Sequence, residues 1–157
     1  ITAPQDRGGN RSNYMAHGLL QLPGNNRELA LYATEAYYAG PGSRVRRFRI
    51  RTDGFVSVHA DQIASEFLTK AFTFDGSQLK VNFLTGPNGS LRFEIQDESG
   101  KAIPGYRLEE GSPLSGDEAE HTVQWSGGST VAALRNRPIR LRVAMQNADF
   151  YSMQFGD

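Results

Sequence analysis

Short runs of alternating apolar and polar residues dominate the chain from Tyr14 onward. Successive side chains of a strand point to opposite faces, so each run predicts a β-strand with one buried face. Clusters of Gly, Pro, Asn and Asp separate most runs, and no strand–helix–strand rhythm appears. The pattern therefore predicts an all-β fold, an antiparallel two-sheet β-sandwich of the jelly-roll kind. The predicted strands are 14–21, 28–34, 44–51, 55–59, 68–74, 78–84, 90–96, 121–126, 139–146 and 150–155.

Turn-forming sequences suggest how some of these strands connect. Asp75-Gly76 and Pro87-Asn88-Gly89 resemble hairpin turns, which predicts an antiparallel meander through the middle of the chain. Helical turns are expected only at 62–67 and 131–134. Residues 1–13 are polar and rich in Gly, so we expect a flexible arm or linker remnant followed by one β-sandwich domain over residues 14–157.

Alternation also predicts which side chains face the core. Leu79, Val81 and Phe83 share one face of their strand, and the neighbouring predicted strands repeat this arrangement. Arg92 and Arg142 then lie on the opposite, polar face of the sheet. That mixed polar surface is a candidate ligand-binding face.

The composition excludes several classes of function. Seventeen Lys and Arg residues balance 17 Asp and Glu residues among 157, so no overall charge favours nucleic acid or an anionic membrane. The absence of cysteine removes disulfides, thiolate nucleophiles and Cys-ligated metals. No apolar run approaches the ~20 residues that a membrane-spanning helix needs. We therefore expect neither a nucleic-acid partner nor a membrane partner.

Aromatic side chains are the first candidates for ligand binding. The C–H faces of sugar rings stack on aromatic rings, and planar polar groups bridge their hydroxyls. Tyr37 and Tyr38 stand beside the turn sequence Gly40-Pro41-Gly42, where alternation leaves at least one ring unburied. Trp125 is a further candidate, although Val123 on the same face favours core packing.

The segment RVRRFRIR is the most unusual local sequence in the chain. If Phe48 and Ile50 face the core, Arg47, Arg49 and Arg51 form a stripe on the opposite face. Guanidinium groups bind carboxylates and sulfates through paired hydrogen bonds, so Arg47 and Arg49 are candidate ligands for an anionic polysaccharide. The alternative is an edge strand that uses charge to prevent pairing with other chains.

Signatures of catalysis are absent from the sequence. The three histidines show no metal-binding spacing, and no G-x-S-x-G nucleophile motif is present. The acidic segment between Tyr106 and His121 is a candidate calcium site, and its alternative is a solvated surface loop. Apart from that calcium, we expect no cofactor, and we expect no enzymatic activity.

The segments FEIQDESGKAIPGY, GDE followed by VQW, and PIRLRVAMQNADFYSMQF resemble the C-terminal β-sandwich region of large bacterial exported proteins related to glycoside hydrolases and sialidases. The resemblance spans roughly residues 53–155 and extends more weakly over 14–52. It implies a non-catalytic, secreted, periplasmic or cell-surface accessory domain, with the parent catalytic domain as a partner in the same chain. A start at Ile1 agrees with a fragment of a longer polypeptide.

Three hypotheses follow. The first is a carbohydrate-binding module that holds a polysaccharide-degrading enzyme at its glycan, for which weak contacts suffice because tethering raises the effective concentration. The second is a structural accessory domain that packs on a catalytic propeller. The third is a stand-alone polysaccharide lyase or hydrolase.

Overall fold

The computed structural model describes residues 13–36, 40–128 and 130–157. Two antiparallel sheets make up the described chain, which confirms the predicted all-β, antiparallel two-sheet fold class. Contacts between residues group the chain into two compact units, Ile1–Phe55 and Val56–Asp157. The sequence pattern had predicted one domain over 14–157. Alternation identifies strands but does not say which strands share a sheet, so it could not reveal this division.

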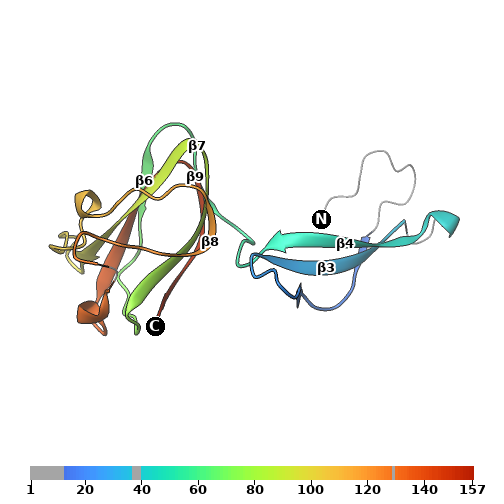
Figure 1. Ribbon diagram of the computed structural model, residues 1–157, viewed down its shortest axis with the longest axis horizontal. Helices are drawn as coiled ribbons and strands as arrows, with labels where there is room; N and C mark the ends of the chain where they lie inside the picture. The colour runs from blue at the N-terminus through green and yellow to red at the C-terminus, as the bar shows by residue number, and fades with distance from the viewer. Residues whose placement is uncertain (1–12, 37–39, 129) are drawn as a thin grey trace. The chain divides into compact units, whose positions relative to one another are not determined.

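The first unit is built around one central strand (Figure 1). Strand β3 pairs along its whole length with β4 on one edge, and the short strands β1 and β2 occupy its other edge. The elements are β1 (Asn13–Met15), β2 (Leu20–Gln21), β3 (Glu28–Glu35), the 3₁₀ turn η1 (Gly40–Gly42) and β4 (Arg44–Arg51). The predicted strands 28–34 and 44–51 are confirmed within one residue, whereas the predicted strand 14–21 consists of two short strands.

The second unit is organised by two long antiparallel strands, β7 and β9. Strands β5 and β6 both pair with the outer edge of β9, and β8 pairs with the outer edge of β7. The elements are β5 (Val58–Ala60), β6 (Ser65–Leu68), β7 (Gln78–Asp97), η2 (Leu108–Glu110), β8 (Asp117–Thr122), η3 (Ala132–Leu134) and β9 (Ile139–Gly156). The helical turn predicted at 62–67 is wrong, because β6 begins there, whereas the one predicted at 131–134 is confirmed as η3.

The segment 86–89 does not form the predicted hairpin turn. Residues 78–85 and 90–97 are two parts of the same strand, and both pair with β9 across a register shift between Thr85 and Ser90. The Asn147 amide of β9 donates a hydrogen bond to the Pro87 carbonyl at 2.9 Å, which holds the extra residues against the neighbouring strand. The segment is therefore a bulge within β7, and the predicted meander is wrong at this point.

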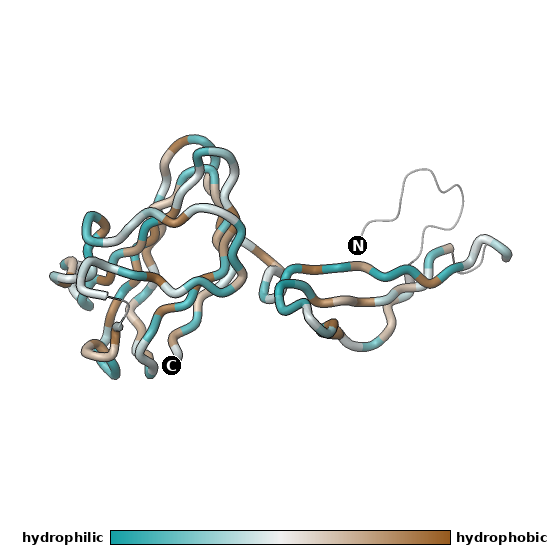
Figure 2. Tube along the Cα trace, viewed as in Figure 1, coloured by the Kyte–Doolittle hydropathy of each residue, from teal (hydrophilic) through white to brown (hydrophobic). Residues whose placement is uncertain are grey.

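Both parts of each long strand contribute to one hydrophobic core in the second unit. The predicted inward residues Leu79, Val81 and Phe83 are all buried, as are Leu91 and Phe93 beyond the bulge. Figure 2 shows hydrophobic and hydrophilic residues alternating along the strands, as this arrangement requires. The bulge preserves the alternation, so one face of the long ladder remains apolar and the other remains polar.

Candidate functional site

The arginines of β4 are divided between the two faces of the first sheet. Register with β3 places Arg47 opposite Tyr32 and Arg49 opposite Ala30, on the face away from Phe48. This is the stripe that alternation predicts. The Arg49 side chain is 62% exposed, and its Nη1 donates to Glu28 Oε2 at 3.1 Å. Arg49 therefore keeps most of its surface available to solvent.

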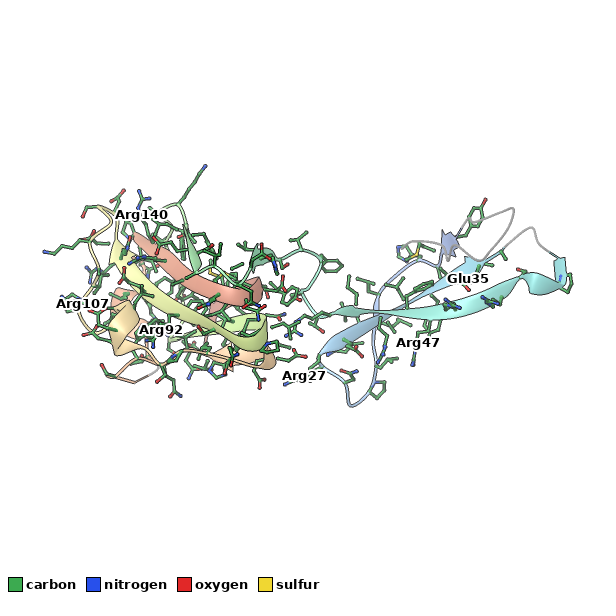
Figure 3. The ribbon with its side chains drawn as sticks, turned by 90° about the horizontal axis from the view of Figure 1, so that it is seen from above. Arg27, Glu35, Arg47, Arg92, Arg107 and Arg140 are labelled. Carbon is green, nitrogen blue, oxygen red and sulfur yellow. The ribbon has the colours of Figure 1, made fainter. Side chains whose placement is uncertain are left out.

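Arg47 is the most available cation of the stripe. The residue is exposed, and within the described ranges its guanidinium forms no hydrogen bond or ion pair. Figure 3 shows Arg47 and Glu35 on opposite sides of the β3–β4 ribbon. Alternate residues of a strand stand about 6.7 Å apart, so Arg47 and Arg49 present two guanidinium groups at a fixed spacing.

The other two arginines of β4 bind a carboxylate of the protein itself. Arg44 Nε donates to Glu35 Oε2 at 2.9 Å, Arg46 Nε forms an ion pair with the same oxygen at 3.1 Å, and the Glu35 side chain is buried. A buried carboxylate needs such partners to offset the loss of hydration. Arg44 and Arg46 are consequently structural cations, and the stripe on the opposite face is the part of β4 that remains open.

Arg142 of the second unit is also committed to internal ion pairs. Its Nη2 and Nε donate to Glu66 Oε2 at 2.6 and 3.1 Å, and its Nη1 lies 3.4 Å from Oε1 of the buried Glu94. The hydrogen bonds to Glu66 raise the pKa of Arg142. Arg142 therefore links three strands of the sheet, and the predicted ligand-binding role does not follow from its surroundings.

Arg92 lies on the same polar face and is held by backbone groups. Its Nη1 donates to the carbonyl oxygens of Leu108 and Gly111 at 3.2 and 2.9 Å. The side chain lines a shallow depression of about 310 Å³ across β6, β9 and β7. The remaining lining residues are Ala64, Ser65, Glu66, Ser90, Ala144, Met145 and Gln146. Arg92 is thus a ligand candidate that is already oriented by the protein.

The aromatic candidates have different outcomes. Trp125 is only 5% exposed, its Nε1 donates to the Phe93 carbonyl at 3.0 Å, and the Tyr106 ring packs edge-on against it. The hypothesis that Trp125 offers a stacking surface for a sugar is therefore wrong. The Trp125 indole packs in the core because it has both apolar neighbours and a hydrogen-bond acceptor inside the second unit. Tyr37 and Tyr38 lie outside the described residues.

Carboxylates of the acidic segment before His121, the candidate calcium site, bond to other groups of the chain. Glu110 Oε2 accepts a hydrogen bond from the Arg107 backbone at 2.9 Å, and Glu120 pairs with Lys80 at 2.9 Å. Within residues 13–36, 40–128 and 130–157, no group of three or more His, Cys, Asp or Glu side chains could hold a metal ion. Glu110 therefore serves a local backbone contact, whereas Glu120 links β8 to β7.

A cluster of polar side chains around His59 lies where β5 pairs with β9, and the sequence pattern did not indicate it. His59 Nδ1 is 3.0 Å from Asp149 Oδ1, its Nε2 is 3.2 Å from Asp61 Oδ1, and the Ser57 hydroxyl donates to Asp149 at 2.8 Å. Because Ser57 contacts the aspartate rather than the imidazole, the cluster is not a nucleophilic triad. Only the pairing of β5 with β9 brings His59 and Asp149 together.

This cluster predicts a pH-dependent contribution to stability. The hydrogen bond to Asp149, and next the one to Asp61, raise the pKa of His59 above its ordinary value of 6.5. The stabilisation is fully present below that unfolded-state pKa and is lost as the pH rises through the higher folded-state pKa. NMR titration should give a His59 midpoint above 6.5, and Asp149→Asn should lower it. A midpoint unchanged by Asp149→Asn would contradict the assignment.

Comparison with protein-family models, with curated proteins and with solved structures finds no match. The structure alone therefore describes the protein, which is all-β with two antiparallel sheets and carries arginine side chains on exposed faces of both. No helix among the described residues has the length and apolar character needed to cross a membrane.

Proposed function

We propose that this chain is a non-catalytic carbohydrate-binding module that binds an anionic polysaccharide through Arg47 and Arg49 of β4. The observation that carries the proposal is the exposed pair of guanidinium groups on one sheet face, opposite the face where Arg44 and Arg46 hold Glu35. In the wider setting we propose, the module holds a parent polysaccharide-degrading enzyme near its glycan outside the cell.

Arginine suits this role because its planar fork matches the two oxygens of a carboxylate or sulfate. Arg47 has no internal partner within the described ranges, so binding would break no ion pair there. Arg49 would exchange or share its contact with Glu28, which is partly exposed. A regular strand backbone holds both side chains at one spacing, which suits a ligand with repeated anionic groups.

Replacing both Arg47 and Arg49 by alanine should weaken binding to polygalacturonate and dextran sulfate by at least about tenfold, since a hydrogen bond to a charged group contributes about 1.5–3 kcal/mol. Titration calorimetry would measure the affinity, with unmodified dextran as the neutral comparison. Raising the salt concentration to several times the physiological level should also weaken binding, because exposed charges are screened.

Lys70→Ala combined with Lys101→Ala is the matched control. Both lysines are exposed and lie in the second unit, so this variant loses the same formal charge without changing β4. Equal losses in the two double variants would show that only net charge matters, and would overturn the assignment of the stripe. Absence of binding to either polyanion by the unaltered protein would overturn the proposed function itself.

A structural accessory role is the second candidate, and exposed apolar side chains favour it. Val56 and Ile63 are 78% and 81% exposed, and Val58 and Leu68 on β5 and β6 are also exposed. Exposed apolar residues along a sheet edge are typical of a surface that a partner covers. This role predicts no saturable glycan binding, and association with a catalytic domain that Val56→Lys and Ile63→Lys would disrupt.

A further inference from the structure

The depression beside Arg92 is built from one row of residues across three strands. Glu66 of β6 and Arg92 of β7 are both directly opposite Ala144 of β9, so all three side chains lie on the polar face of the sheet. Neighbouring strands are about 4.8 Å apart, which places the two charged residues about 10 Å from one another at the backbone. The small alanine between two long side chains accounts for the hollow at this position.

Arg92 presents an unused side of its guanidinium group. Both of its hydrogen bonds to the backbone use Nη1. Within the described ranges, Nε and Nη2 have no hydrogen-bond partner. Those two N–H groups form a fork that fits the two oxygens of a carboxylate. The anchored Nη1 reduces the side-chain freedom that binding would otherwise cost.

Glu66 supplies the complementary group on the other side of the depression. Its Oε2 accepts two hydrogen bonds from Arg142, which balances its charge and leaves Oε1 able to accept a hydrogen bond from a hydroxyl group. Ser90 and Gln146, which are paired across β7 and β9, add a hydroxyl and an amide to the lining. The depression therefore combines one carboxylate-binding fork with several groups that bind hydroxyls.

We propose that this depression binds a single uronic acid residue, with the sugar carboxylate on Arg92 and a ring hydroxyl on Glu66. A volume of about 310 Å³ lies at the lower end of the range of small-molecule sites, about 300–1,000 Å³. The inference goes beyond the proposed function because it assigns a second site, in the other unit, with its own ligand class. It holds even if Arg47 and Arg49 bind nothing.

The test uses the full chain and two matched probes, a galacturonic acid trimer and its methyl ester, in an NMR titration. The acid should shift the backbone amide signals of Ser90, Ala144 and Gln146 saturably. The ester keeps the hydroxyls but removes the charge, so it should bind at least about tenfold more weakly, as expected for the loss of a charged hydrogen bond.

Two variants locate the site and a third serves as the control. Ala144→Leu should abolish binding by filling the depression while leaving every charge in place, and Arg92→Lys should weaken it because a lysine lacks the fork. Arg140→Lys, four positions before Ala144 on β9 and outside the lining of the depression, should bind like the unaltered protein. Unchanged core signals in each spectrum would confirm folding.

Binding that survives Ala144→Leu would overturn the proposal, as would equal affinity for the acid and the ester. Loss of binding in the Arg47→Ala, Arg49→Ala double variant together with normal binding in Ala144→Leu would assign the acid to the stripe and not to this depression. The opposite result would support the depression, and the polysaccharide titrations of the Arg47→Ala, Arg49→Ala variant would still decide the proposed function of the stripe. The two proposals can therefore fail separately.

Discussion

Phe83→Ala is expected to lower the free energy of unfolding of the second unit by about 3–5 kcal/mol. Phe83 is fully buried in the core and lies next to the register shift where β7 changes its pairing with β9. Removing the ring loses its transfer free energy and leaves a cavity that the long, continuously paired strands can fill only in part. Urea unfolding followed by fluorescence would measure the loss, since Trp125 is the only tryptophan and is buried in the same unit.

Leu84→Ala is the control for this prediction. Leu84 is the next residue of β7 but faces the other side of the sheet and is exposed. Its truncation should cost less than about 1 kcal/mol, as is usual for surface positions. Similar losses for Phe83→Ala and Leu84→Ala would contradict the assignment of the two faces of β7.

Gly89→Ala is expected to destabilise the second unit by about 3 kcal/mol, the upper part of the usual range for overpacking. A Cβ atom at Gly89 would overlap the Asn147 carbonyl oxygen and lie 3.0 Å from the Gln146 carbonyl oxygen. Both neighbours are backbone atoms of β9, so neither can move away without disturbing the ladder. The same urea experiment with Trp125 fluorescence would measure the effect.

Gly127→Ala is the matched glycine control in the same unit. A Cβ atom at Gly127 would meet no atom within 4 Å, and the residue does not have a positive φ. Its substitution should leave stability nearly unchanged or raise it slightly, because alanine has less freedom in the unfolded chain. If Gly89→Ala behaved like Gly127→Ala, the close approach of the bulge to β9 would be wrong.

The bulge also illustrates why local sequence misled the prediction of connections. Gly86-Pro87-Asn88-Gly89 has the composition of a hairpin turn, and Asn88 does have a positive φ of 59°. Whether such a segment reverses the chain depends on where the flanking residues find hydrogen bonds. Here they find them on β9, more than fifty residues away along the chain, and no local pattern reports that partner.

For the arginines of the candidate sites, the sequence likewise predicted the face of the sheet but not the partners of each side chain. Alternation alone placed Arg47 and Arg49 on one face of β4, and Arg92 and Arg142 on the polar side of the second sheet. It could not separate Arg142, which is held by Glu66 and Glu94, from Arg92, which bonds through Nη1 alone. That distinction depends on contacts between β6, β7 and β9, and Glu66 and Arg142 are 76 residues apart.

The sequence by itself determined the all-β class, most strand positions, the inward and outward faces and the absence of cysteine chemistry, because these depend on side-chain type and a two-residue period. Tertiary structure alone decided that the chain forms two units, that Trp125 is buried, that His59 meets Asp149 and that Ala144 opens a hollow beside Arg92. Each of these depends on which distant strands pair, and pairing is selected by the packing of the whole unit rather than by neighbouring residues.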